Sequence, residues 1–246
     1  MGFFKKKNED DAFVIVEHRN TLHKNLKFTA TEQYKLLRTN LGFILSEEEK
    51  CPVIGITSST RGEGKSTTAI NLAYVLAENG SRVVLIDGDM RLPSVARKMR
   101  IKGDPGLTNL LMKKEISIES FATALSEKLY IIPSGPIPPN PSELLQGERF
   151  KKLIKDLRNV YDYIIIDCPP IGAVSDAVIV GNHSDGVALV MAAEKISYKL
   201  AQKIKKQLQN GNCKILGVIL NKVPLKGKNY YGKYYGKYYG KDYYKK

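Results

Sequence analysis

One short segment of this 246-residue sequence carries the residue types that bind phosphate groups. Residues 57–67 read Thr-Ser-Ser-Thr-Arg-Gly-Glu-Gly-Lys-Ser-Thr, between an apolar run and a helical pattern. Gly62 and Gly64 let the backbone approach a phosphate closely, and the amides at the start of the next helix favour negative charge. The Lys65 ammonium can reach the β- and γ-phosphates of a nucleotide, and the Ser66 hydroxyl can ligate Mg²⁺. The residues expected to bind nucleotide are Arg61, Gly62, Glu63, Gly64, Lys65, Ser66 and Thr67.

This segment departs from the usual phosphate-loop pattern, G-x-x-x-x-G-K-[ST], at one position. Ser59 stands where that pattern has its first glycine. The simplest alternative is a glycine-rich turn that does no more than cap a helix. Because a strand, a Gly-x-Gly-Lys-Ser-Thr run and a helix coincide here, we favour the phosphate site.

Two further apolar runs end in acidic residues that can hold a metal ion. Asp87 and Asp89 follow one run, and Asp167 follows another. An acid at the end of a strand beside a phosphate loop is positioned to hold Mg²⁺ or its waters. Each acid alone could instead belong to a turn or cap a helix, but their joint occurrence with the loop favours metal binding. The expected metal ligands are Ser66, Asp87 and Asp167.

The same acids supply candidates for proton transfer. A nearby Mg²⁺ would keep Asp87 ionised, and its place suits the base that takes the proton from an incoming hydroxyl. Asp89 could do this instead, or could bind Arg91, and the sequence leaves that choice open. Three histidines, His18, His23 and His183, have no partners at catalytic spacing. The candidate catalytic residues are Lys65, Asp87, Asp89 and Asp167.

The elements that must position these residues alternate between strands and helices from residue 52 onward. Near-continuous runs of Val, Ile and Leu between helical patterns predict an α/β fold, a mostly parallel P-loop sheet with helices on both faces. Ligands of such sheets bind at the carboxyl ends of the strands, where the loop and the acids fall. Strands are predicted at 53–57, 83–86, 129–132, 163–166, 187–191 and 215–220. Helices are predicted at 31–46 with Thr31 as N-cap, and at 66–78, 94–99, 117–125, 142–157, 175–182 and 198–209.

The composition is that of a folded protein with an excess of basic residues. Apolar residues make up 43% and charged residues 26%, and 39 Lys and Arg against 25 Asp and Glu give a net charge of +14. No apolar run approaches the ~20 residues that span a bilayer, and secretory and N-myristoylation signals are absent. Cys51, Cys168 and Cys213 share no metal or disulfide spacing, which predicts reduced thiols in a cytoplasmic protein.

The last 22 residues differ in composition from the rest of the chain. Residues 225–246 hold seven Lys and one Asp, hence a charge of +6, and eight of the 14 Tyr. Without apolar periodicity this tail is predicted to be disordered, after an N-terminal arm at 1–29, with a short edge strand near 12–16, and a folded domain at 30–224. Lysines between aromatic residues are also typical of segments that bind single-stranded nucleic acid or anionic lipid, so an anionic-polymer-binding tail is one alternative function.

Together these residues resemble the bacterial tyrosine kinases (BY-kinases) of capsule and exopolysaccharide export. That family combines a Walker A loop, an A-prime motif of the form hydrophobic-D-x-D-x-R, a Walker B motif ending in D-x-P, and a C-terminal tyrosine cluster. These motifs stand here at Gly62–Thr67, Asp87–Arg91, Asp167–Pro169 and Tyr230–Tyr244, and the proline-rich loop at 133–145 also looks like the family.

The resemblance covers about residues 30–246, and it implies an ATP- and Mg²⁺-dependent protein-tyrosine kinase. Such an enzyme would autophosphorylate its tail and regulate polysaccharide polymerisation and export. One departure is Arg61, an extra cation where the family usually has Pro or Ala. The implied acceptor residues are Tyr230, Tyr231, Tyr234, Tyr235, Tyr238, Tyr239, Tyr243 and Tyr244.

The resemblance also implies partners. Glu32, Lys35 and Arg38 match the family's E-x-x-R-x-x-R helix, which packs against a neighbour in a homo-oligomeric ring, although Lys35 lacks the planar fork of arginine. Without a spanning segment the chain is expected to be the stand-alone form, recruited to the inner face of the membrane by a chain-length or activator protein whose cytoplasmic tail completes the site. A tyrosine phosphatase is expected as well, and no specific nucleic acid.

The role of one residue and one alternative function also stay open. Related ATPases use an Asn at the place of Asn221 to bind adenine, and capping of the strand end is an equal alternative for this residue. A partitioning or cell-division ATPase of the deviant Walker A type would carry a signature lysine five residues before Lys65, where Thr60 stands, and would need no tyrosine cluster.

Overall fold

The fold is known from a computed structural model that describes residues 26, 28–45, 50–112 and 123–223. Most of the arm at 1–29 and all of the tail at 225–246 lie outside the described residues, and the predictions for them stay predictions. No helix among the described residues is long and apolar enough to cross a membrane.

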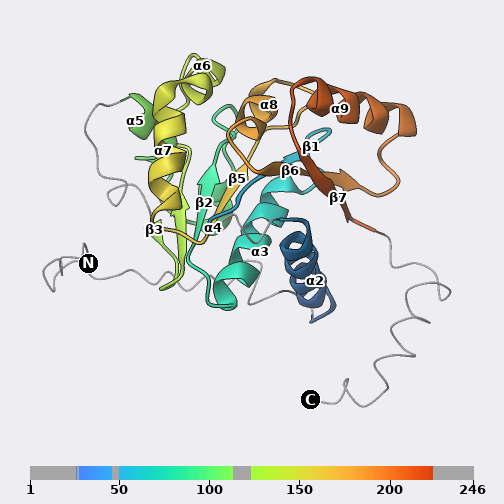
Figure 1. Cartoon of the computed structure of the whole chain (residues 1–246), viewed down its shortest axis with the longest axis horizontal. Coiled ribbons are helices and arrows are strands. Elements are labelled where there is room, and N and C mark those ends of the chain that lie inside the picture. The colour runs from blue at the N-terminus through green and yellow to red at the C-terminus, as the bar shows by residue number, and fades with distance from the viewer. Residues whose placement is uncertain (1–25, 27, 46–49, 113–122, 224–246) are drawn as a thin grey trace, which may run out of the picture.

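A seven-stranded sheet forms the centre of the molecule, with the strand order β3-β4-β2-β5-β1-β6-β7 (Figure 1). Six of its strands are parallel, as predicted, and the short β3 pairs antiparallel with β4 at one edge. The strands are β1 (Val53–Ser58), β2 (Val83–Asp87), β3 (Thr123–Ala124), β4 (Leu129–Ile132), β5 (Tyr163–Asp167), β6 (Gly186–Ala192) and β7 (Ile215–Asn221).

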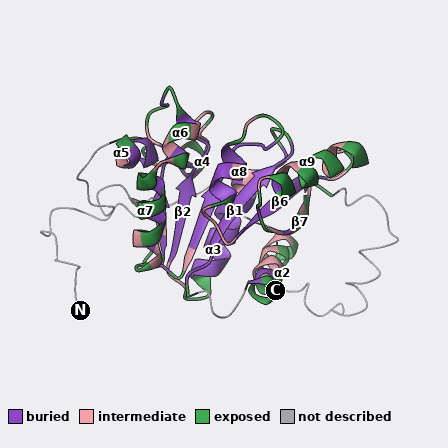
Figure 2. Ribbon diagram, turned by 45° about the horizontal axis from the view of Figure 1, so that its top comes forward, coloured by how far each residue is buried: buried purple, intermediate pink, exposed green. Residues whose placement is uncertain are grey.

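Helices cover both faces of this sheet and bury its central strands, whereas the edge strand β7 keeps Val218 and Leu220 exposed (Figures 1 and 2). One face packs against α2 (Phe28–Ile44), α3 (Lys65–Glu78) and α4 (Val95–Met99). The other face is covered by α5 (Leu107–Met112), α6 (Pro141–Gln146), α7 (Glu148–Arg158), α8 (Asp176–Gly181) and α9 (Tyr198–Asn210). Every residue of β1, β2 and β6 is buried, as expected for a sheet covered on both sides.

The strand predictions are confirmed, and three helix predictions need correction. The helix expected at 142–157 is interrupted at Gly147, whose extended backbone (φ −68°, ψ 152°) separates α6 from α7. The helix expected at 117–125 is wrong at its end, because Thr123 and Ala124 pair with β4 instead. Thr31 is not an N-cap, since α2 already begins at Phe28. The short α5 was not predicted.

The strand order places the candidate active-site residues close together. Since β5 lies between β2 and β1, it neighbours both the strand that precedes the phosphate loop and the strand that ends in Asp87. In the β2–β5 register Asp87 lies directly beside Asp167. The two acids that the sequence places 80 residues apart therefore share one edge of the sheet with the loop.

Candidate active site

The phosphate loop joins β1 to α3 through two glycines in left-handed conformations. Gly62 has φ +80° and Gly64 has φ +106°, backbone angles that other residues rarely adopt. Within the described part of the chain, the amides of residues 61–66 donate to no other group. A row of unpaired amides ahead of a 14-residue helix is the arrangement that binds a phosphate anion.

The side chain of Glu63 stabilises the phosphate loop through hydrogen bonds, a role that the sequence did not reveal. Its side chain is buried, and its Oε2 accepts hydrogen bonds from Ser59 Oγ at 2.5 Å and the Thr60 amide at 2.8 Å. Its Oε1 accepts a longer bond of 3.4 Å from the amide of Ala192 on β6. The hydroxyl that replaces the first glycine of the usual pattern thus holds the loop in shape.

Lys65 lies among three acids at the N-terminus of α3. Its Nζ is 2.8 Å from Asp89 Oδ2 and 3.4 Å from Asp167 Oδ1. Burial opposes the charge on Lys65, but the carboxylates of Asp167 and Asp89 outweigh burial and raise the pKa of the ammonium. Lys65 is therefore a firmly charged cation, held in the site by carboxylate groups.

Asp87 and Asp167 each have one buried oxygen without a partner among the described residues. Asp87 Oδ2 accepts from the amides of Ser94 and Val95 at 3.1 and 3.0 Å, whereas Oδ1 accepts no bond. Asp167 Oδ2 is likewise unpaired. Burial and the neighbouring Asp167 raise the pKa of Asp87 to about 7, and burial raises the pKa of Asp167 against the lowering effect of Lys65.

These unpaired oxygens fit a hard divalent cation. Buried carboxylate oxygens without a donor are costly, and a cation that binds them removes the cost. The Ser66 hydroxyl belongs to the same group, since it is 3.3 Å from Lys65 Nζ and accepts a 2.9 Å bond from Ser94 Oγ. An all-oxygen set of two carboxylates and a hydroxyl suits Mg²⁺. Ser94 was missed because nothing in its sequence position links it to the loop.

Arg91 binds outside this group, so the alternative that Asp89 binds Arg91 is wrong. Its guanidinium lies 2.8 and 3.2 Å from the two oxygens of Asp176 on α8, and its Nη2 donates to Ser142 on α6 at 2.9 Å. The carboxylate of Asp89 pairs with Lys65 and accepts from the Leu92 amide at 3.1 Å. The arginine of the A-prime motif therefore ties the loop after β2 to two helices.

The end of β7 closes over the phosphate loop. Asn221 Nδ2 donates to the Glu63 carbonyl at 2.8 Å, and Lys222 Nζ donates to the Gly62 carbonyl at 2.5 Å. Asn221 thus lies beside the loop, while its role toward adenine stays a prediction. Lys222, which the sequence did not single out, brings a further cation to the same place.

The predicted interface helix presents only part of its expected pattern to solvent. Lys35 pairs with Glu32 at 3.0 Å, and Arg38 Nη1 donates to the Val75 carbonyl on α3 at 2.8 Å. Arg38 therefore also joins α2 to the body of the fold. Arg61 at the tip of the loop is exposed.

The chain is similar to a family of AAA domains and to bacterial tyrosine-protein kinases. Residues 51–215 match the family model of an AAA domain. The chain is 44% identical over 203 residues to the tyrosine-protein kinase YwqD of Bacillus subtilis, covering 82% of this chain and 85% of that protein. It is 42% identical over 195 residues to the tyrosine-protein kinase CpsD of Streptococcus agalactiae, covering 78% and 83%.

Solved structures with this fold include a tyrosine-kinase domain and a septum site-determining protein. The kinase domain of Escherichia coli tyrosine kinase ETK matches with a TM-score of 0.78 at 28% identity, covering 94% of this chain and 88% of that one. The chimerical protein CapA2B2 matches with a TM-score of 0.77 at 33% identity, covering 83% and 90%. A Pyrococcus horikoshii septum site-determining protein, MinD, complexed with Mg-ADP, matches with a TM-score of 0.58 at 26% identity, covering 69% and 70%.

Proposed function

The chain belongs to the bacterial tyrosine-protein kinases, and from that premise we propose that it uses MgATP to phosphorylate the tyrosines of its own C-terminal cluster. One observation carries this proposal. Asp87 and Asp167 lie side by side at the edge where the phosphate loop ends, each with an unpaired buried oxygen. A kinase needs its phosphate-binding residues, its metal ligands and its proton acceptor close together, and this edge of the sheet offers all three.

The loop amides and Lys65 would hold the phosphates of ATP. The unpaired amides of residues 61–66 suit the phosphate oxygens, and Lys65 would exchange its bonds to Asp89 and Asp167 for bonds to phosphate. Arg61 and Thr67 lie at the two ends of this loop. Asn221, beside Glu63 at 2.8 Å, is the residue proposed to meet the adenine.

Ser66, Asp87 and Asp167 would hold Mg²⁺, directly or through water. Magnesium, when bound, supplies neutralisation of the charge on the transferring phosphoryl group. The unpaired Oδ1 of Asp87 and Oδ2 of Asp167 are the atoms offered for it. The complex of MinD with Mg-ADP is a precedent on this fold.

Asp87 is the proposed base for the tyrosine hydroxyl. Its Oδ1 accepts no hydrogen bond from the described residues, and a Mg²⁺ held nearby would keep the carboxylate ionised and able to take the proton. Asp89 stays the alternative base, because its Oδ2 would be released when Lys65 turns to the phosphates. Positioning and charge neutralisation contribute the rest of the catalysis.

The acceptors proposed are the eight tyrosines between Tyr230 and Tyr244. They follow β7, whose end lies at the phosphate loop, so the tail begins close to the site. If the tail is disordered, as its composition predicts, its 22 residues have a root-mean-square span of ~25–28 Å, which permits transfer within one chain or to a neighbour. We favour transfer within a ring in which Glu32, Lys35 and Arg38 contribute to the interface.

In the cell the kinase would act with a membrane chain-length or activator protein on capsular or exopolysaccharide polymerisation and export. The likeness to the chimerical protein CapA2B2 and to the kinases above supports this expectation. Recruitment to the inner face of the membrane, and reversal by a tyrosine phosphatase, follow from the same proposal.

The proposal is tested by mass spectrometry of phosphotyrosine after incubation with MgATP. The full chain is incubated with and without a peptide of the cytoplasmic tail of such a partner, and Lys65→Met serves as the control that cannot position phosphate. Phosphotyrosine should appear within residues 230–244 of the parent and not of the variant. Absence of phosphotyrosine in the parent under both conditions contradicts the proposal.

Transfer between chains is tested by mixing two variants. A Lys65→Met chain with an intact tail is mixed with an active chain whose eight tail tyrosines are Phe. Label on the Lys65→Met tail supports transfer to a neighbour, and an unlabelled tail contradicts it.

A further inference from the structure

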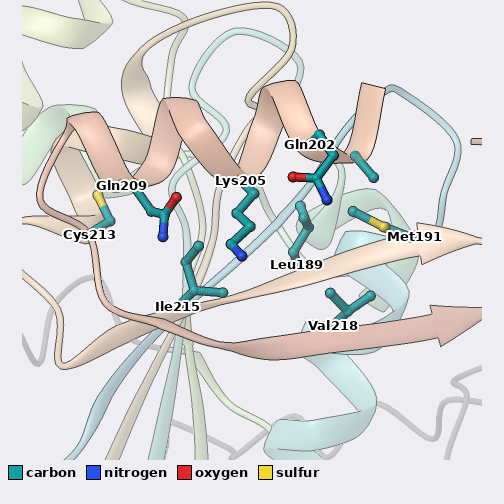
Figure 3. Close-up of a pocket in the computed structure, with 9 residues that line it drawn as sticks. Leu189, Met191, Gln202, Lys205, Gln209, Cys213, Ile215 and Val218 are labelled. Atoms are coloured by element: carbon teal, nitrogen blue, oxygen red, sulfur yellow. The ribbon is translucent and has the colours of Figure 1, made fainter. Parts of the chain in front are cut away.

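A cleft under α9 is separate from the phosphate site. Its volume is about 580 Å³, within the range of small-ligand pockets. Its floor is formed by β6 and β7 and is apolar, as the side chains in Figure 3 show. The lining residues are Leu189, Met191, Ala201, Gln202, Lys205, Gln209, Cys213, Ile215 and Val218.

The roof of this cleft is polar and basic. Gln202, Lys205 and Gln209 point from α9 toward the strands (Figure 3). Among the residues that the structure describes, no acidic one lines the cleft. The helix itself carries four lysines and no acid, and none of those lysines takes part in an ion pair within the described chain. An apolar floor below a single ammonium and two amides suits a ligand that is aromatic at one end and anionic at the other.

We infer that this cleft is a phosphotyrosine-binding site and that its ligand is the phosphorylated C-terminal tail of the same chain. A phosphotyrosine has a flat apolar ring and a phosphate of about two negative charges at its tip. The ring matches the floor of Met191 and Val218, and the phosphate matches Lys205 with its flanking amides. The inference rests on the proposed autophosphorylation for its ligand, but not for the chemistry of the cleft.

The chain path allows this docking. Val218, on the floor, precedes the last described residue, Val223, by five residues, or ~17 Å along a strand. Tyr230 follows Val223 by seven residues, which extend to at most ~25 Å. The first tyrosine pair can therefore fold back to the cleft, and the later pairs have more chain to spare.

Charge makes the site selective for the phosphorylated state. The unmodified tail carries +6 and is repelled by the lysines of α9. Phosphorylation of all eight tyrosines adds about −12 to −16, which turns the tail to roughly −6 to −10 and the repulsion into attraction. The cleft would thus bind the tail of its own chain once that tail is phosphorylated.

The test uses synthetic peptides of residues 224–246 and the full chain, freed of phosphate by a tyrosine phosphatase that is then removed. One peptide carries phosphotyrosine at all eight tyrosine positions, a second carries none, and a third carries phosphoserine at all eight positions. Calorimetry or fluorescence anisotropy measures binding to the parent, to Lys205→Gln and to Lys203→Gln. Lys203 is the matched control, since it lies on the same helix but does not line the cleft.

The phosphotyrosine peptide should bind the parent at least about tenfold more tightly than either other peptide does. Lys205→Gln should weaken it about tenfold, and Lys203→Gln less than about twofold. Val218→Glu places a negative charge on the floor of the cleft, where it would repel the phosphate and weaken binding. Because the side chain of Val218 is exposed, this change should not disturb the core. Equal losses for Lys203→Gln and Lys205→Gln would show a diffuse basic surface, as for anionic lipid, and overturn the site; so would equal binding of the phosphoserine peptide.

These binding measurements also distinguish the proposed phosphotyrosine site from the proposed autophosphorylation. Because the peptides are synthetic, binding is measured whether or not the chain phosphorylates itself. A chain that binds the phosphotyrosine peptide but never labels its own tail supports the site and contradicts autophosphorylation. A chain that labels its tail but does not bind the peptide overturns the site alone.

Discussion

Asp87 combines two properties that oppose each other, deep burial and an unpaired carboxylate oxygen. Its side chain is buried beside Asp167, and burial together with that neighbour raises its pKa to about 7. The amides of Ser94 and Val95 stabilise one oxygen only. The residue is therefore an acid whose charge costs folding free energy until a cation joins it.

This conflict predicts how stability depends on pH. Between about 4 and about 7 the folded protein holds a proton on Asp87 that the unfolded chain has lost, so this group lowers the free energy of unfolding as pH rises. Asp87→Asn removes the effect. In EDTA, the melting temperature of the variant relative to the parent should rise from pH 5 to pH 8, although the variant loses kinase activity.

Asp156→Asn is the control, because Asp156 pairs with an exposed lysine on the surface of α7. Its melting temperature relative to the parent should stay nearly constant over the same range. A constant difference for Asp87→Asn as well would contradict the account of the buried acid.

The ion pair of Arg91 with Asp176 predicts a separate effect, on the free energy of unfolding. Asp176 is fully buried, and Arg91 is its bidentate partner. Removing one member of a buried pair leaves an uncompensated charge, and since the arginine is 38% exposed we discount the usual cost to about 2 kcal/mol for Arg91→Ala. Chemical denaturation measures it. Arg91→Ala with Asp176→Asn should recover part of the loss, and no recovery would contradict the pairing.

At the scale of elements, the phosphate loop depends on the end of β7. A Cβ on Gly64 would lie 2.0 Å from Asn221 Nδ2, and its φ of +106° is strained for any other residue. A Cβ on Gly62 would meet nothing within 4 Å, so there only the backbone angle of +80° matters. The two glycines therefore separate steric contact from backbone strain.

Gly64→Ala should reduce nucleotide binding and stability more than Gly62→Ala, which carries only a strain of ~1–2 kcal/mol. Adding Asn221→Ala to Gly64→Ala removes the contact but not the strain, so stability should recover toward that of Gly62→Ala. Thermal melts and titration with a fluorescent ATP analogue measure both. Equal effects of the two single variants would sink this explanation.

The elements also show which parts of the site follow from sequence. Apolar runs placed all six parallel strands, and the rule that strands end at one edge placed Lys65, Asp87 and Asp167 together. The pairings across the fold did not follow: Arg91 meets Asp176 across 85 positions, and Ser66 meets Ser94 only through the strand order. Local patterns carry periodicity, whereas strand order and side-chain partners depend on packing of the whole chain.

Local signals misled where tertiary contacts override them. Residues 123–124 belong to a helical pattern, but an edge beside β4 was open to pairing. Gly147 lies inside a strong helical period, yet glycine has a low helix propensity, and an extended conformation there separates α6 from α7. In both places the neighbouring element decides the conformation, and a window along the sequence does not contain that neighbour.

At the scale of the whole molecule, we propose that the charge of +14 is one of two charge states between which phosphorylation switches the chain. The tail contributes +6 of it, and the active site that would receive a tail contains Asp87, Asp89 and Asp167. A basic tail is attracted to such a site, whether in its own chain or in a neighbour of the ring. Full phosphorylation brings the chain to roughly +2 to −2 and the tail to a negative charge, which those carboxylates repel.

We therefore expect phosphorylation to weaken assembly of the ring or binding of the membrane partner. Light scattering after size exclusion should give a smaller mean mass for the phosphorylated chain than for the same chain after phosphatase treatment, with the difference reduced at high salt. A chain with all eight tail tyrosines changed to Phe should keep its mass after MgATP. Equal masses of the two states of the parent, with unchanged affinity for a partner peptide, would contradict the switch. If masses differ and Lys205→Gln narrows the difference, the cleft under α9 contributes by retaining the released tail.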